Sequence, residues 1–507
     1  MGPDNLLQSP SRRSLLAGGV AAGLGIAAAG CSPPEESNHS GLITIPDPAV
    51  TLPDEDLTFR VVDSGDTKAN YWNELLATYS DKHSHITTEY DALPWNEIEE
   101  LVPLAVRNKT LHDLVQLLPG PLLNQAIKAE WILPLDDVMP GFEEWKSQYP
   151  ENVLFEGLHM HGGKTYTFPA TADNRYEICL LYSKRLMDEA GFDPESEPLT
   201  WDDYREAARK ITTAGNGQAY GIVLEGAQEN RLDFWINGLA QMGGGYGSNP
   251  ANGEFDYASD AWYDAFELLQ SLLADGSIFP GSTSLTAPQA WPRVATSSAG
   301  MVTAGPWVIT TWENESPEFE FGVAAHPRPS AEALPIGYAP GKMSDVMFVY
   351  SGTTSPEVAG DLMAYHGSIE AAKAWTQIVG PGSPSPYPEA VEAAKESVSA
   401  AGRRSLELAE EQVLMPSSVV RNPDVALADQ QMEALTPSLG EIVSGVIDGS
   451  ITDVRSALQD LSDRSNRQRD DAIEAARAAG AEVSREDWVF PNFTPGENYT
   501  QDMYGEL

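Results

Sequence analysis

Apolar and polar residues alternate in the first patterned stretch, "LTFRVVDSGD", where Leu57, Phe59 and Val61 share one face. This period of two predicts a β-strand, and the Ser64-Gly65 pair that follows predicts a turn. The next apolar residues recur at the spacing i, i+3, i+4 and i+7, and they are Trp72, Leu75, Leu76 and Tyr79. That spacing predicts an amphipathic helix after the first strand.

The same two periods continue along the chain. "HITTEYDAL" and "LHDLVQLL" have the pattern of strands, and "WNEIEELVPLAVRN" between them has that of a helix despite Pro103. The order β-α-β-α-β predicts a parallel sheet with helices on its faces. Ligands of such sheets bind beyond the carboxyl ends of the strands. The candidate binding turns are therefore Ser64 to Asp66, Leu93 to Trp95 and Gln116 to Pro119.

Three further helices are predicted between residues 200 and 370 from the residues at which they begin. Thr200 followed by Asp203 fits a capping box, in which each residue bonds the other's backbone N–H. Ser259 precedes another apolar helical run, and Ser355 precedes Pro356 at the first position of a third. The last amphipathic stretch begins near Thr452, and no repeat of fixed period is visible.

The first 31 residues are expected to be an export signal. Arg12 and Arg13 precede a short run rich in Gly and Ala, which is typical of a twin-arginine signal and too short for a stable membrane span. The run ends in "AAGC", similar to the site at which bacterial lipoproteins are cleaved and acylated on cysteine. We expect lipidation of Cys31, with plain secretion as the alternative. Residues 32–56, rich in Pro, Ser and Glu, are expected to form a flexible tether.

Composition narrows the choice of partners. The chain has 31 basic and 75 acidic residues, a net charge of −44, which argues against nucleic acid and anionic lipid surfaces. The acidity favours a solvated surface, and attraction of a cationic ligand is the alternative. Cys179 is the one cysteine besides Cys31, so no disulfide framework is expected, and Cys179 is predicted to be buried.

One long segment carries a family resemblance. "GGKTYTFPATADNRYEICLLYSKRLMDEAGFDPESEPLTWDDYREAARKI" is similar to a stretch of the extracellular solute-binding proteins of bacterial ABC importers, family 1, the sugar-binding class that includes maltose-binding protein. The resemblance continues in the same order through "SAGMVTAGPW", "FEFGVAAHPRP" and "VGPGSPSPYPEAV". It covers roughly residues 57–470.

The resemblance implies an α/β fold of two lobes, with hinge strands and a central ligand cleft. Lobe one would hold residues 57–167 and 326–383, and lobe two would hold residues 168–325 and 384–480, followed by a C-terminal extension, 481–507. The chain would cross between the lobes near Phe168-Pro169, His326-Pro327 and Pro384 to Pro386. Solute in the cleft would favour a closed form that membrane permease subunits recognise.

The tryptophan of "AGPW" is the first candidate for solute contact. Gly305 allows close approach of the backbone and Pro306 restricts it, so that the indole of Trp307 is held in one orientation. A flat indole suits the C–H face of a pyranose, and a core position behind the cleft is the alternative. The resemblance also implies that Trp235 and Asn237 line the groove.

Planar polar groups are suited to bracket pairs of sugar hydroxyls. Asp173 and Arg175 stand on a predicted strand whose alternation would place Asn174 on the other face, and a structural Asp-Arg pair in the hinge is the alternative. The resemblance adds four positions, Asp66, Trp95, Gln116 and Asp345. Leu118 and Pro119 replace charged residues of some maltose-type relatives, which argues against a maltodextrin ligand.

The sequence contains no motif that indicates catalysis, cofactor binding or metal binding. A secreted polysaccharide-active enzyme would need two carboxylates across the scissile bond, and the sequence carries neither a G-x-S-x-G nor an H-E-x-x-H motif. The pairs His83 with His85 and His159 with His161 lack an evident third metal ligand. The resemblance therefore implies a binding protein, with no cofactor or metal expected, whose solute is a sugar, with a peptide or polyamine as the alternative. The aromatic tail could strap a lobe or form an interaction patch.

Overall fold

The computed structural model describes residues 40–65, 67–118, 121–340 and 345–507. Two main sheets, of five and four strands, organise these residues, and hydrophobic clusters cover both faces of each. The chain therefore forms two lobes. None of the described helices is long and apolar enough to cross a membrane.

The sheet of lobe one has the strand order β2-β1-β3-β14-β4. β1 pairs in parallel with β2 and β3, whereas β14 runs antiparallel to β3 and β4. The predicted parallel β-α-β-α-β unit is therefore confirmed. The elements of this lobe are β1 (Leu57–Asp63), α1 (Lys68–Lys82), β2 (Ile86–Ala92), α2 (Trp95–Asn108), β3 (Leu114–Val115), α3 (Pro121–Lys128), β4 (Ile132–Leu133), α4 (Leu135–Val138), α5 (Phe142–Gln148), β5 (Met160–His161), β6 (Lys164–Thr165), β14 (Phe348–Tyr350), α12 (Pro356–His366) and α13 (Ile369–Val379).

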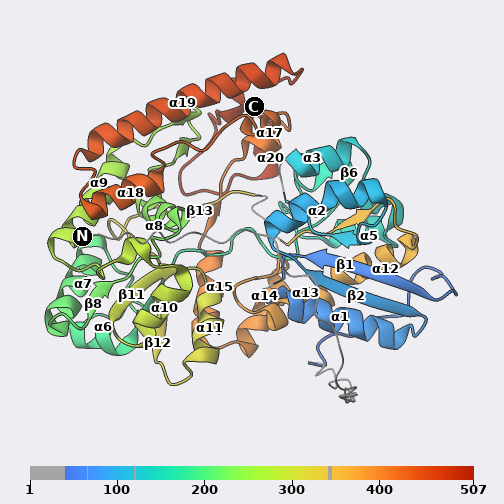
Figure 1. The fold of residues 1–507 in the computed structure, drawn as a ribbon, viewed down its shortest axis with the longest axis horizontal. Coiled ribbons are helices and arrows are strands. Elements are labelled where there is room, and N and C mark those ends of the chain that lie inside the picture. The colour runs from blue at the N-terminus through green and yellow to red at the C-terminus, as the bar shows by residue number, and fades with distance from the viewer. Residues whose placement is uncertain (1–39, 66, 119–120, 341–344) are drawn as a thin grey trace, which may run out of the picture. The chain divides into compact units, whose positions relative to one another are not determined.

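Both faces of this sheet are buried, because successive strand residues point to opposite sides. Val61 packs in the core formed with α1, α12 and α13, and its neighbour Val62 packs in the core formed with α2 and α3. Leu114 and Val115 of β3 divide in the same way. Figure 1 shows α1 and α2 on opposite sides of the strands β1 and β2.

The sheet of lobe two has the order β12-β7-β11-β8. β8, β11 and β12 run in one direction, and β7 runs against them. The elements of this lobe are β7 (Cys179–Ser183), α6 (Lys184–Ala190), α7 (Trp201–Gly215), β8 (Tyr220–Ile222), α8 (Glu229–Met242), β9 (Ser248–Asn249), β10 (Glu254–Phe255), α9 (Asp260–Ala274), α10 (Ala287–Ala295), β11 (Ala299–Ala304), α11 (Trp307–Glu315), β12 (Phe321–Ala324), α18 (Leu439–Asp448) and α19 (Val454–Ala478).

Lobe two repeats the packing of lobe one. Leu180 and Met301 face a core built from α7, α8 and α9, whereas Leu181 and Val302 face one built from α10 and α11. The helix α7 begins with the predicted capping box, since Thr200 accepts from the Asp203 N–H and Asp203 accepts from the Thr200 N–H, each at 3.2 Å. Cys179 is fully buried, and burial raises the pKa of its thiol to about 12.

Three segments connect the two lobes. Ala170 packs in the lobe-one core and Tyr176 in that of lobe two, so the first connection lies between them. Ile336 still packs in lobe two and Val346 packs in lobe one, which bounds the second connection. Val379 packs in lobe one and Leu408 packs in lobe two, which bounds the third. The elements that lie along the connections and beyond them are β13 (Gly337–Tyr338), α14 (Pro388–Ser397), α15 (Ala400–Glu410), β15 (Val413–Leu414), α16 (Ser418–Arg421), α17 (Val425–Asp429) and α20 (Gln501–Tyr504).

The C-terminal tail acts as a strap within the described chain. The backbone N–H of Phe490 donates to Pro250 of lobe two, and that of Tyr499 donates to Leu414 in β15. The N–H of Gln501 reaches Asn152 in lobe one, at 3.1 Å. The tail thus bonds to both lobes, whereas the sequence suggested either a strap on one lobe or an interaction patch.

Candidate functional site

A single segment of the chain, residues 171–178, connects the edges at which the parallel strands of the two sheets end. In lobe one, Ser64 follows β1 and Gln116 follows β3, while Asp345 precedes the antiparallel β14 and so lies at the same edge. In lobe two, Glu225 follows β8 and Trp307 follows β11. Residues 171–178, the crossing segment, lead from the first edge to the second. This is the position at which α/β sheets bind ligands.

The lobe-one edge is held by contacts among its own polar groups. Lys68 donates to Ser64 and lies 3.2 Å from a carboxylate oxygen of Asp345. Asp345 also accepts from the hydroxyl of Thr171 at 2.7 Å, which ties the crossing segment to this edge. Gln116 accepts from the Ser64 N–H at 3.0 Å. These side chains form a rigid, largely buried network.

Two buried groups at this edge have shifted pKa values. Asp63 is 1 % exposed, and burial raises the pKa of its carboxyl group, against the lowering effects of Lys68 and of hydrogen bonds from Tyr90 and Gly65. Burial also lowers the pKa of His366 to about 4, so this ring is neutral at physiological pH while it packs against Tyr71.

The lobe-two edge is built around the half-buried indole of Trp307. A Cβ atom added to Gly305 would lie 2.1 Å from an atom of this ring, so the ring packs flat on the bare backbone of Gly305. The close approach that the sequence predicted for Gly305 is therefore confirmed. Only glycine leaves room for the ring in this orientation.

Two arginines flank the indole of Trp307. The guanidinium carbon of Arg175 lies 5.7 Å from the ring centroid, and that of Arg231 lies 5.2 Å from it. Arg175 donates to Glu177 at 2.7 and 3.0 Å, and Arg231 lies 3.5 Å from Glu225. The edge therefore combines one aromatic ring with two planar Arg–Glu pairs.

Glu225 is the most deeply buried acid of this edge, with 4 % exposure. It accepts a short hydrogen bond from the indole N–H of Trp291 in addition to its contact with Arg231. Burial raises the pKa of Glu225, and these two partners lower it in part.

A small cavity of about 90 Å³ lies along the crossing segment. Asp173, Arg175 and Asn237, all predicted from the sequence, line it together with Phe234 and Gln241 of α8. A cavity of this volume holds a few water molecules, because water occupies about 30 Å³ in the liquid. This volume is below the roughly 300 Å³ at which small-molecule sites begin.

The crossing segment departs from its predicted form. Turns at 173–174 and 177–178 replace the expected strand. The reason is that the segment makes no ladder with either sheet. Asp173 and Arg175 still line the small cavity together without Asn174, as predicted, but Asp173 also lines a larger cavity with Asn174.

The other predicted residues have different outcomes. Gln116 and Asp345 lie at the lobe-one edge, 1 % and 9 % exposed. Trp235 is 2 % exposed in the lobe-two core, because the apolar face of α8 packs on the sheet, and it offers no open ring face. Asp66 and the side chain of Trp95 lie outside the described residues, as do Arg12, Arg13 and Cys31.

Sequence reasoning missed Lys68, Thr171, Glu225 and Arg231. Glu225 follows the short strand β8 in "YGIVLEG", and a strand prediction there would have placed it at a carboxyl end. No local signal pairs Arg231 with Glu225, or Lys68 with Asp345.

The chain belongs to the family of bacterial extracellular solute-binding proteins, whose profile matches residues 74–401. A binding protein of Brucella abortus (strain 2308) is 25% identical over 259 residues, which are 51% of this chain and 59% of that protein. The chain thus spans less than two thirds of this relative. An amino-acid ABC transporter periplasmic-binding protein of Sinorhizobium fredii (strain NBRC 101917 / NGR234) is 27% identical over 192 residues, which are 38% of this chain and 40% of that protein.

A solved structure shares the fold. The cyclic alpha-maltosyl-1,6-maltose binding protein of Arthrobacter globiformis is 20% identical, with a TM-score of 0.57, over 84% of this chain and 100% of that one. The expected two-lobed α/β fold of solute-binding proteins is confirmed.

Proposed function

We propose that this protein captures a carbohydrate, a mono- or oligosaccharide, between the two sheet edges and delivers it to the permease subunits of an ABC transporter. The observation that carries the proposal is the indole of Trp307, placed at the carboxyl edge of the lobe-two sheet and flanked by two Arg–Glu pairs. The family assignment and the sugar-binding structure of similar fold support it.

The chemistry of this edge suits a sugar. An indole offers an apolar face to pyranose C–H groups and an N–H at its rim. Carboxylates accept from paired hydroxyls, and guanidinium groups donate to them in a fixed plane. The charges at the edge are already paired within the protein, so a neutral solute would leave no net charge uncompensated.

Binding would couple to closure of the lobes. The crossing segment is fixed to lobe one through Thr171 and to lobe two through Arg175, so it joins the two halves of the site. A solute that contacts both edges favours the arrangement in which they approach each other. A permease pair that recognises this arrangement would receive the loaded form.

The location proposed for the protein is the outer face of the cytoplasmic membrane. Arg12 and Arg13 support export, and Cys31 supports a lipid anchor. The tether predicted for residues 32–56 is shorter than expected, because Ile43 and Ile45 pack in the lobe-one core, so only the part before Ile43 is proposed as a tether. Mass spectrometry of the exported protein tests this directly. A diacylglycerol-modified Cys31 is expected, and an unmodified secreted chain would contradict the anchor without affecting the binding proposal.

The function is tested by a thermal-shift screen of the purified chain against mono- and oligosaccharides, with amino acids, peptides and polyamines as comparison sets. A ligand that binds the native state alone raises the midpoint by mass action. We expect one sugar class to shift it, Trp307→Ala to abolish the shift, and no product to form on incubation. A shift by a peptide or a polyamine that Trp307→Ala abolishes would change the assigned solute, and turnover of a glycan would indicate an enzyme.

A further inference from the structure

A second, larger cavity lies apart from the two sheet edges. Its volume is about 1050 Å³, at the upper end of the range of roughly 300 to 1000 Å³ that is usual for small-molecule sites. It shares only Ala172, Asp173 and Tyr338 with the small cavity, and none of Gln116, Asp345, Arg175, Glu225 and Trp307 lines it. Its walls come from α5, α13, the connections between the lobes and the C-terminal strap. The proposed carbohydrate site does not account for it.

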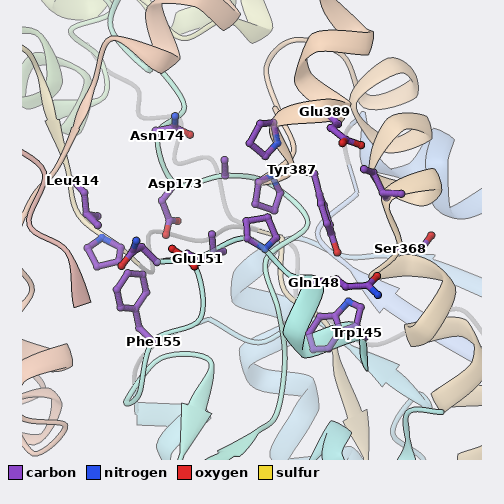
Figure 2. Close-up of a pocket in the computed structure, with 18 of the residues that line it drawn as sticks. Trp145, Gln148, Glu151, Phe155, Asp173, Asn174, Ser368, Tyr387, Glu389 and Leu414 are labelled. Carbon is purple, nitrogen blue, oxygen red and sulfur yellow. The ribbon is translucent and has the colours of Figure 1, made fainter. Parts of the chain in front are cut away.

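Two aromatic side chains of this cavity are fixed by one backbone atom. The indole N–H of Trp145 donates to the carbonyl oxygen of Gly367 at 2.8 Å, and the hydroxyl of Tyr387 donates to the same oxygen at 2.7 Å. Tyr149 packs against both rings, with centroid distances of 4.9 and 5.3 Å. Figure 2 shows Trp145 and Tyr387 on one side of the cavity and Asp173 and Phe155 on the other. The rings are thus ordered before any ligand arrives.

The charged side chains of the cavity are all acidic. The carboxylates that line it are those of Glu144, Glu151, Asp173, Glu370 and Glu389, and no Lys, Arg or His belongs to the lining that the structure describes. The four glutamates are solvent-exposed at the rim of the cavity and form no ion pair with any described residue. By contrast, Lys395 nearby in sequence neutralises two exposed glutamates outside the cavity, Glu392 and Glu410, at 2.7 and 2.6 Å.

The negative potential acts on the phenols of the cavity. Burial raises the pKa of Tyr338 to about 12, and Asp173 adds to the shift. Burial raises the pKa of Tyr387 to about 12 as well, with a further contribution from Glu370 and an opposing one from its contact with Trp145. Ionisation of these hydroxyls is thus opposed by carboxylates from two different walls.

We infer that the large cavity is a second binding site, which takes an organic cation with amino groups on an elongated apolar body. Ammonium groups bind to the faces of Trp and Tyr rings and form charge-assisted hydrogen bonds with carboxylates. Carboxylates on several walls fit a ligand with more than one amino group. An anionic solute would meet uncompensated repulsion, and a neutral one would leave the four glutamates as they are.

Isothermal titration of the purified chain with spermidine, a linear tri-amine, tests the inference. We expect saturable binding at one site, and about tenfold weaker binding in the double variant Glu370→Gln/Glu389→Gln, because two charge-assisted contacts are lost. The matched control is Glu143→Gln/Glu396→Gln, which removes two exposed charges from α5 and α14 outside the cavity. We expect this control to bind within about twofold of the parent chain.

Three results would overturn the inference. They are the absence of saturable spermidine binding, an equal loss in the control variant, and full displacement of spermidine by MgCl₂ at matched ionic strength, which would indicate diffuse attraction to the acidic surface. Trp307→Ala separates the two sites. Retained spermidine binding in this variant supports a separate cavity, whereas its loss would be a fourth contrary result, because it would move the cation to the sheet edges. A carbohydrate screen without a binding sugar would contradict the proposed function but would not change the interpretation of any of these spermidine titrations.

Discussion

The two sheet edges share a topology and differ in what their side chains do. Each edge lies at the carboxyl ends of parallel strands, with one antiparallel strand in the sheet. At the lobe-one edge the buried Lys68–Asp345 pair is bonded into the crossing segment through Thr171. At the lobe-two edge a half-buried indole lies between two guanidinium groups.

This difference indicates that one edge stabilises the fold, here called support, and the other contacts the solute, here called recognition. A network of buried, mutually bonded groups resists rearrangement, because breaking one contact exposes a charge without a partner. A half-buried aromatic ring with planar polar neighbours retains surface that a solute can cover. The comparison therefore assigns the lobe-one edge mainly to stability and the lobe-two edge mainly to solute contact.

The strongest test of this division is Asp345→Asn. The change removes the charge that faces Lys68 but keeps an oxygen for Thr171, and asparagine tolerates the positive φ of 53° at this position. We expect the free energy of unfolding to fall by about 3 kcal/mol, since the buried ammonium group of Lys68 loses the carboxylate that lies 3.2 Å from it. Urea denaturation measures the loss.

The matched control for this change is Asp47→Asn, in which an exposed pair with Lys82 is broken. We expect a change below about 1 kcal/mol there, because water screens the interaction. Equal losses in the two variants would show that the lobe-one edge is no more rigid than the surface.

The second test acts on the lobe-two edge through Gly305→Ala. The added Cβ would meet the ring of Trp307 at 2.1 Å, so the indole must turn away although it is still present. We expect solute to bind about tenfold more weakly and unfolding to become easier by about 2 kcal/mol through overpacking. Calorimetric titration with the sugar found by screening measures the first effect, and unchanged affinity would exclude the ring from the site.

Much of the fold could be predicted from local patterns. The alternation of Leu57, Phe59 and Val61 and the capping box at Thr200 depend on neighbouring residues, and both were confirmed. β14 was not predicted, because it enters the lobe-one sheet from about two hundred residues further along the chain. Its three residues have no period to distinguish them from a buried loop.

The candidate site was predictable only in part. Trp307 and Gly305 form a contact two residues apart, which local geometry can suggest. Trp235 shows the limit, since an aromatic residue on a helix is more often buried against a sheet, as it is here. The pairing of Arg231 with Glu225 depends on how α8 returns to the strand end, which no short motif encodes.

A third test uses pH to compare one acid from each edge. Burial raises the pKa of both Glu225 and Asp63, so their ionised forms destabilise the folded state. The stability they contribute is complete below the unfolded pKa and is lost as the pH rises through the folded pKa. For Glu225 this loss begins near its ordinary value of 4.5.

We therefore expect the parent chain to lose stability relative to Glu225→Gln as the pH rises from about 4.5 towards neutrality, by at most about 1.4 kcal/mol per pH unit. Asp63→Asn should show the same sign at the other edge. Denaturant midpoints measured across this range provide the check. A difference that grows in the opposite direction would mean that Arg231 outweighs burial at Glu225.

The smallest expected effects come from a pair of amides, one near each edge. Gln116 is buried and accepts from the Ser64 N–H, so Gln116→Ala should lower the free energy of unfolding by about 1 kcal/mol. Asn237 is exposed at the small cavity, so Asn237→Ala should leave stability within about 0.5 kcal/mol and weaken solute binding about threefold. Affinity and unfolding are measured on both variants. If Gln116→Ala weakened binding without loss of stability, the lobe-one edge would contact solute itself, and the division between support and recognition would fail.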